Sequence, residues 1–205
     1  MTAPTLREEH VALTRERIMQ GLERLLIDGR DVTFAGLAVS SGVQERTIYR
    51  HYANRAALYE AFWAWVHDRL GQITASNLSE LLSQTRSVMT NFDANEALIR
   101  EMIRNPEGQS IRQTANDWRT KMFLSIVAQE APELDAAELR RTAALVGLMF
   151  SAPTWQMLRD YWDMEGAEAG DTAALGIQLI IEAAKARAKT AQSASKPRKT
   201  TAKEK

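Results

Sequence analysis

Residues 33–52 read TFAGLAVSSGVQERTIYRHY, and their spacing is that of a helix-turn-helix unit. Ala38 is small where two helices would cross closely, and Gly42 permits the positive φ that a tight turn requires. Ile48 would hold the second helix against a core. Helix-turn-helix units place this second helix in the major groove of DNA. The stretch therefore predicts two short helices joined by a turn, which form either a DNA-reading unit or an ordinary packed helix pair.

The second helix of the pair carries side chains that can form hydrogen bonds with DNA. Those that we expect on its exposed face are Gln44, Glu45, Arg46, Thr47, Tyr49, Arg50 and His51. Hydrogen-bonding and basic residues of these types suit base edges and phosphates. A solvated helix face would carry the same residue types, so the spacing alone leaves both interpretations open.

The flanking sequence extends the pattern. A helix with apolar spacing ends at Gly29, Thr33 can cap the next helix, and Asn54 can cap a long helix after the pair. In this order, about residues 14–58 resemble the amino-terminal domain of the TetR family of bacterial transcriptional regulators. The positions that match the family's pattern are Thr33, Leu37, Ala38, Gly42, Val43, Thr47, Ile48, Tyr49, His51, Tyr52 and Leu58.

The resemblance implies roles for individual residues. Thr33, Tyr49 and His51 would contact phosphates, and Arg55 keeps a phosphate-binding charge where Lys is usual. Gln44 stands where Ser is common, so the cap of the second helix would come from an amide, which is a weaker capping group. The candidates for contacts with base edges are Gln44, Glu45, Arg46, Thr47 and Arg50.

The rest of the chain also has helical spacing, and the alternation typical of strands is almost absent. The predicted fold is therefore all-α. We expect a helix-turn-helix domain over residues 1–53, joined by a long helix to a ligand-binding and dimerisation domain over 54–186. Ala, Lys, Thr and Ser dominate residues 187–205, which predicts a disordered basic tail. Within the second domain, the spacing predicts one long helix through residues 111–126 and a loop over 166–170.

The TetR resemblance implies a ligand cavity in the second domain. Aromatic and methionine side chains after Phe62 are the candidates to line it, although a stripe at helical spacing is also what an ordinary core would show. The predicted lining residues are Trp65, Met89, Phe92, Met102, Trp118, Met122, Met149 and Trp155. Polar neighbours such as Gln113, Asn116, Glu96 and Arg119 are candidates to orient a ligand.

Two helices resemble the pair that forms a four-helix dimer interface in the same family. They are expected over residues 135–151 and 172–185, and they are apolar on more than one side. A helix of that kind needs more than one packing partner. The sequence therefore predicts a homodimer, with burial inside one subunit as the alternative. The residues concerned are Leu139, Leu145, Val146, Ile177, Leu179, Ile180 and Ile181.

The composition excludes several classes of protein. The 205 residues include no Cys, which rules out disulfides, a thiol nucleophile and Cys-based metal sites. The three His residues show no metal-ligand spacing and we find no catalytic motif, so we expect no metal, no cofactor and no enzyme. No run of about 18 apolar residues predicts a membrane span. Residues 1–10 lack the apolar centre of a signal peptide, so the expected location is the cytoplasm.

The net charge of zero hides a segregation of charge along the chain. Residues 71–184 carry a net charge of −7, whereas residues 185–205 carry +7. A neutral total therefore does not exclude a nucleic-acid partner, because the distribution of charge matters more than the sum. The basic end of the chain is either a solvated tail or a non-specific contact with DNA phosphates.

These observations predict a ligand-responsive transcriptional regulator. We expect a repressor that binds inverted-repeat double-stranded DNA as a homodimer and is released by a small, largely apolar effector. The alternative from another class is an all-α binding or adaptor protein without sequence-specific DNA binding, in which residues 33–52 are only a packed helix pair. An activator, or a regulator without a small-molecule effector, is a further alternative.

Overall fold

The computed structural model describes residues 5–71, 73–114 and 116–195, with side chains through residue 190. Over these residues every regular element is an α-helix, which confirms the predicted all-α class. The helices are α1 (Leu6–Ile27), α2 (Phe34–Ser41), α3 (Glu45–His51), α4 (Arg55–Arg69), α5 (Leu78–Ala94), α6 (Glu96–Arg104), α7 (Pro106–Gln113), α8 (Asn116–Glu130), α9 (Ala136–Met149), α10 (Ala152–Trp162) and α11 (Gly166–Ser195).

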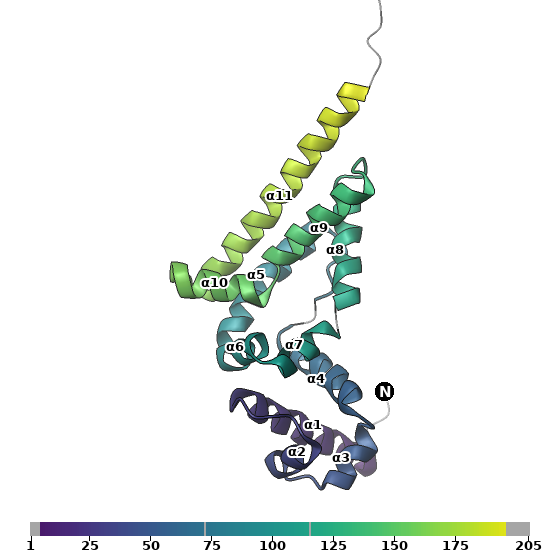
Figure 1. Cartoon of the computed structure of the whole chain (residues 1–205), viewed down its shortest axis with the longest axis vertical. Helices are drawn as coiled ribbons and strands as arrows, with labels where there is room; N and C mark the ends of the chain where they lie inside the picture. The colour runs from purple at the N-terminus through teal and green to yellow at the C-terminus, as the bar shows by residue number, and fades with distance from the viewer. Residues whose placement is uncertain (1–4, 72, 115, 196–205) are drawn as a thin grey trace, which may run out of the picture.

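The first three helices form one end of the molecule (Figure 1), with α2 packed between α1 and α3. The Thr33 hydroxyl accepts a hydrogen bond from the Gly36 N–H at 2.9 Å and so caps α2, as predicted. Gly42 ends α2 in the left-handed region at φ +64°, which confirms its predicted role in the turn. Ile48 is fully buried and fixes α3 to the core. Gln44 makes no capping hydrogen bond with its side chain, so the predicted amide cap is wrong.

The helices from α5 onward form the other end of the molecule, and α4 leads from one end to the other (Figure 1). In this second part α11 packs against α5 and α9, and α8 packs against α9. Trp155, Leu81, Met89 and Ile177 are fully buried between these helices. One continuous core joins the two parts, and it includes buried residues of α4.

The predicted single helix through residues 111–126 is two helices in the structure. Asn105 caps α7 by accepting a hydrogen bond from the Gly108 N–H at 2.8 Å. Pro106 occupies the first turn of α7, where its missing N–H costs nothing. A Cβ atom on Gly108 would lie 2.3 Å from the Met102 Cα, so glycine is required where α6 meets α7.

The predicted loop over residues 166–170 is also wrong, because α11 begins at Gly166. A Cβ atom on Gly166 would lie 2.8 Å from the Met89 carbonyl oxygen. One on Gly170 would lie 2.8 Å from the Arg86 Cα. These glycines therefore allow α11 to cross α5 at close range, and this is the physical reason for a glycine pattern that resembles a loop.

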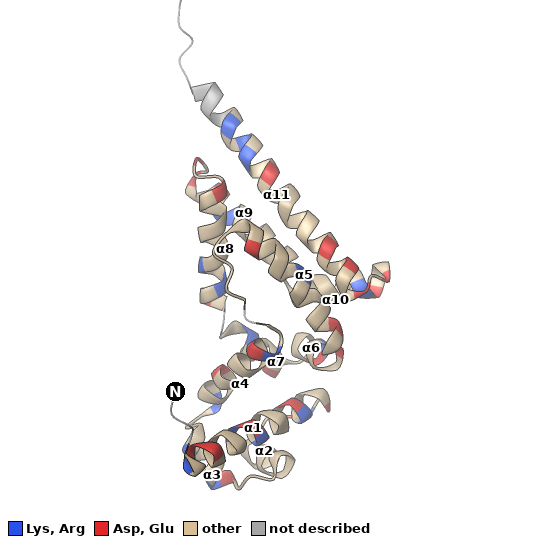
Figure 2. Cartoon of the chain, turned by 180° about the vertical axis from the view of Figure 1, so that it is seen from behind, with Lys and Arg blue, Asp and Glu red and all other residues tan. Residues whose placement is uncertain are grey.

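The predicted disorder from residue 187 onward is wrong for residues 187–195, which continue α11. Alanine-rich sequence of this kind has high helix propensity, and Ala184 and Ala188 are buried. Arg187 pairs with Glu138 of α9 at 3.7 Å. Figure 2 shows basic residues gathered toward the end of α11 and acidic ones nearer its start. Residues 196–205 of the predicted tail lie outside the described part of the chain.

Candidate nucleic-acid interface and ligand cavity

Helix α3 and the residues next to it carry most of the side chains that the sequence predicts to contact DNA. Ile48 points inward, and the residues around it on α3 are therefore turned toward solvent. Thr33 is exposed at the start of α2, on the other side of the turn. The exposed members of the predicted set are Thr33, Gln44, Glu45, Arg46, Tyr49, Arg50 and Arg55, while Thr47 and His51 are half-buried.

Tyr49 is held in a fixed orientation by a stacked ring. Its ring lies on that of Phe34, with centroids 4.3 Å apart and an angle of 8° between the planes. Phe34 is buried, whereas Tyr49 remains half exposed. The stack therefore joins the start of α2 to α3 and leaves the outer part of Tyr49 accessible to a partner.

His51 sits among positive charges at the end of α3. Burial, followed by the charges of Arg15 and Arg50, lowers the pKa of His51 below its ordinary value. The imidazole is therefore neutral at pH 7 and could donate one N–H to a phosphate. Arg15 lies on α1, and sequence reasoning missed it because only its position in the fold brings it near α3.

Two further arginines of α1 brace the turn and were also missed. Arg17 Nη2 donates a hydrogen bond to the Gly42 carbonyl oxygen at 3.0 Å. Arg24 Nη2 donates to the Ser40 carbonyl oxygen at 2.6 Å. Both carbonyls belong to the end of α2, where helical partners are lacking. These contacts hold the end of α2 and the turn that leads to α3 against α1.

Arg55 joins the interface to the second part of the molecule. Its guanidinium pairs with the Glu107 carboxylate at the start of α7, and its Nη2 donates to the Tyr59 hydroxyl at 2.6 Å. The Tyr59 hydroxyl donates to the same carboxylate. Burial and this hydrogen bond raise the pKa of Tyr59 to about 12, so the hydroxyl stays protonated. Arg55, predicted as a phosphate contact, thus also ties α4 to α7.

The second part of the molecule contains a cavity of about 820 Å³. This volume is typical of pockets for small molecules. Its walls come from α4, α5, α6, α7, α8, α9 and α10. Of the predicted lining residues, Phe92 and Met102 lie on its wall, together with the predicted polar neighbours Gln113, Asn116 and Arg119.

The other six predicted lining residues lie elsewhere. Met89 and Trp155 are buried in the core, and Trp155 Nε1 donates to Asp93 Oδ1 at 2.7 Å. Trp65 Nε1 donates to Glu16 Oε2 of α1 at 2.8 Å. Trp118 and Met122 line a separate shallow depression. Met149 lies at the contact between α9 and α11. Helical spacing identified these as inward residues, but it does not say which space they face.

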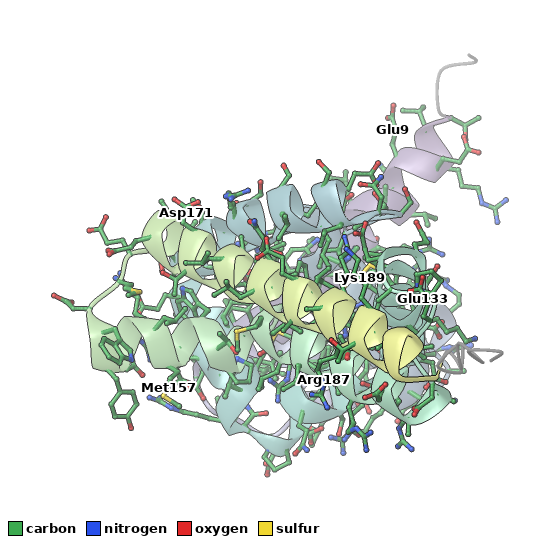
Figure 3. All side chains as sticks on the ribbon, turned by 90° about the horizontal axis from the view of Figure 1, so that it is seen from above. Glu9, Glu133, Met157, Asp171, Arg187 and Lys189 are labelled. Atoms are coloured by element: carbon green, nitrogen blue, oxygen red, sulfur yellow. The ribbon has the colours of Figure 1, made fainter. Side chains whose placement is uncertain are left out.

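A strip of apolar side chains on α9 and α11 is exposed. The outward residues Leu145, Leu148, Leu175 and Leu179 are each about half exposed, with values of 50%, 52%, 55% and 55%. Val146, Ile177 and Ile181 of the predicted dimer set are instead buried inside the subunit. Figure 3 shows α11 lying along the outside of the domain, with Arg187 and Lys189 in its C-terminal half.

The described residues also bear on metal sites and membrane spans. Within residues 5–71, 73–114 and 116–195, His, Asp and Glu do not form a group of three or more that could hold a metal ion. In the same part of the chain, every helix is too short or too polar to cross a membrane.

Comparison with known proteins gives partial similarity. No family model matches the chain. The chain is 31% identical over 78 residues to the nucleoid occlusion factor SlmA of Shewanella frigidimarina, covering 37% of this chain and 38% of that protein. It is 38% identical over 58 residues to the nucleoid occlusion factor SlmA of Idiomarina loihiensis, covering 27% and 30%. The chain thus matches less than two fifths of the length of either relative, and what it shares with them is a segment.

Proposed function

We propose that this protein is a transcriptional regulator of the TetR type, which binds an inverted-repeat DNA site as a homodimer. The observation that carries the proposal is the geometry of α2 and α3. Ile48 anchors α3, the turn at Gly42 is braced from α1, and hydrogen-bonding side chains lie on the outer face of α3. A helix held in this way is the element that helix-turn-helix proteins insert into the major groove.

The similarity to nucleoid occlusion factors supports a partner of this kind, because their name connects them with the nucleoid, the DNA-containing body of the bacterial cell. Nucleoid occlusion itself is not part of the proposal, since the similarity covers 38% and 30% of those proteins.

The exposed leucines of α9 and α11 are the proposed dimer interface. Leu145, Leu148, Leu175 and Leu179 come from two neighbouring helices, so a second copy related by a two-fold axis would bury them against the same strip. A dimer of this kind presents two copies of α3. In the simplest case the two must lie about 34–36 Å apart to reach successive major grooves.

The proposed response to a ligand runs through α7. This helix contributes Gln109, Arg112 and Gln113 to the cavity wall, and its Glu107 holds Arg55 at the start of α4. A ligand that prefers a different position of α7 would shift α4 and with it the spacing of the two α3 helices. The ligand can change DNA affinity only by the difference in its own affinity for the two states. We propose that this change releases the DNA, as in a repressor.

A binding selection from random duplexes tests the DNA-binding proposal. We expect enrichment of one inverted repeat at moderate salt, bound with roughly 10³-fold or greater preference over unrelated DNA, as is usual for specific regulators. The matched control is Arg46→Ala together with Arg50→Ala, which removes two exposed cations of α3 and leaves the buried core intact. If the wild type enriches no palindrome, the adaptor alternative without specific DNA binding is favoured.

A further inference from the structure

The wall of the cavity carries positive charge without matching negative charge. Arg112, Arg119 and Arg140 contribute to it. Among the described residues that line the cavity, Asp and Glu are absent. The remaining wall is largely apolar, with Ile99, Met102 and Phe92 at the end formed by α5 and α6.

Arg112 is the least satisfied of these cations. Its Nε atom is buried and has no hydrogen-bond partner among the described residues. Burial lowers the pKa of Arg112, but a guanidinium still stays protonated at neutral pH. A buried N–H donor of a half-buried cation that lacks a partner costs folding free energy.

Arg119 lies beside Arg112 and adds a second positive charge. Its Nη2 donates to the Arg112 backbone carbonyl oxygen at 3.1 Å, and its guanidinium lies 5.4 Å from the centre of the Trp63 ring. Burial, followed by the charge of Arg112, lowers the pKa of Arg119. In the described part of the chain neither arginine forms an ion pair with a carboxylate.

Arg100 shows how this fold treats an arginine that serves structure. Arg100 is mostly buried, and it forms ion pairs with Glu96 at 2.7 Å and with Asp160 at 2.6 Å. For Arg100 the chain itself supplies the carboxylates. The contrast indicates that the partner of Arg112 and Arg119 comes from outside the chain.

We propose that the cavity binds an apolar organic molecule with an oxyanion head, a carboxylate or a phosphate, whose oxygens accept hydrogen bonds from Arg112 and Arg119. The inference rests on the proposed function only in treating this molecule as the effector. A volume of about 820 Å³ has room for roughly 25 non-hydrogen atoms, because a water molecule occupies about 30 Å³ in the liquid. The apolar body would lie against Ile99, Met102 and Phe92.

The position of the anion links it to the DNA-binding end. Arg112 lies on α7, five residues after Glu107, which pairs with Arg55 of α4. An anion that draws Arg112 toward the cavity therefore acts on the same eight-residue helix that holds α4.

Isothermal titration calorimetry on the full chain, without DNA, tests the inference. The probes are undecanoate, decyl phosphate and decan-1-ol, which share a ten-carbon alkyl chain and differ in the head. We expect the better of the two anions to bind at least about 10-fold more tightly than the alcohol, and the ratio between the anions identifies the head. Arg112→Gln and Arg119→Gln should each weaken anion binding about 10- to 100-fold and leave the alcohol unchanged, as expected for a charge-assisted hydrogen bond.

Two controls separate binding from folding. Arg141→Gln removes the same charge from an exposed position of α9 outside the cavity wall and should change nothing. Arg112→Gln should unfold at the same or a higher temperature than the wild type, because it removes a half-buried charge whose Nε atom has no partner. Arg119→Lys keeps the charge but loses the two-pronged donor, and should weaken anion binding less than Arg119→Gln does.

Equal affinity of the wild type for both anions and the alcohol would overturn the inference. So would a lower unfolding temperature of Arg112→Gln with equal loss of all three probes, since that outcome describes a structural arginine. Because DNA takes no part in the titration, failure of the proposed function leaves this result intact. Absence of anion binding in a protein that still selects a palindrome refutes only the present inference.

Discussion

Replacing Glu107 by Gln should strengthen DNA binding, because it releases Arg55 to bind a phosphate. In the structure the Glu107 carboxylate neutralises Arg55 at the start of α4. The neutral amide keeps the shape of the side chain and removes the ion pair. The Tyr59 hydroxyl still accepts from Arg55, so the arginine remains near its present position.

The size of the effect follows from the exposure of the pair. The side chains of Arg55 and Glu107 are 49% and 23% exposed, so solvent screens much of their attraction. A pair of this kind is worth about 0.2–1 kcal/mol. Taking about 0.5 kcal/mol for each of two subunits gives about 1 kcal/mol, or roughly a 5-fold increase in affinity for the dimer. Every additional phosphate that the protein neutralises should also steepen the dependence of log K on log salt by about 0.9.

Fluorescence anisotropy of a labelled duplex over a salt series measures both quantities. The matched control is Glu101→Gln, which removes the same charge from an exposed pair with Arg104 at 3.1 Å on α6. We expect a slope steeper by up to about 1.8 for Glu107→Gln and an unchanged slope for the control. If both variants behave alike, or if Glu107→Gln binds DNA more weakly, Glu107 does not hold Arg55 back from a phosphate and this reasoning is refuted.

Three further predictions concern other parts of the molecule. Arg46→Ala or Arg50→Ala should each cost about 1–3 kcal/mol of DNA binding and relax specificity at one position per half-site, and wild-type affinity of both variants would refute base contacts by α3. Leu179→Glu should split the dimer and abolish specific DNA binding, because it would bury a charge in an apolar interface; sedimentation of a folded, intact dimer would remove that interface. His67 accepts a hydrogen bond from the Ile73 N–H at 3.2 Å, and burial lowers its pKa below the ordinary value of about 6.5. Protons therefore bind the unfolded state first, so the free energy of unfolding should fall as pH drops below about 6.5, and His67→Gln should flatten that dependence in denaturant titrations at pH 7 and pH 5.

The helix-turn-helix geometry could be predicted because each of its features is local. Thr33 caps the helix that follows it, and Gly42 takes a backbone conformation that glycine allows at low cost. Ile48 is buried because the opposite face of its helix is polar. Each of these requirements is met within a few residues, so the sequence pattern is sufficient to identify them.

The glycines of the second part were harder to interpret, because glycine can serve either to allow a positive φ or to leave space for a neighbouring helix. Gly42 provides a positive φ, whereas Gly166 and Gly170 provide space for α5 to pass close to α11. From the sequence both uses look like a break in a helix. Only the position of α5, more than 70 residues earlier in the chain, distinguishes them.

The cavity wall could not be predicted for a related reason. Helical spacing identifies a side chain as inward, but Met89 is buried in the core while Phe92, three residues on, reaches the cavity. Because arginine on a helix is usually exposed to solvent, nothing in the sequence indicated that Arg112 lines the cavity. Arg55 and Glu107 are 52 residues apart, and their pairing depends on how α7 is set against α4. The residues that we propose to couple the cavity to the DNA-binding end are therefore joined by contacts between segments that lie far apart in the sequence. Local pattern can locate the DNA-reading helix, but the coupling to a ligand becomes visible only in the packed structure.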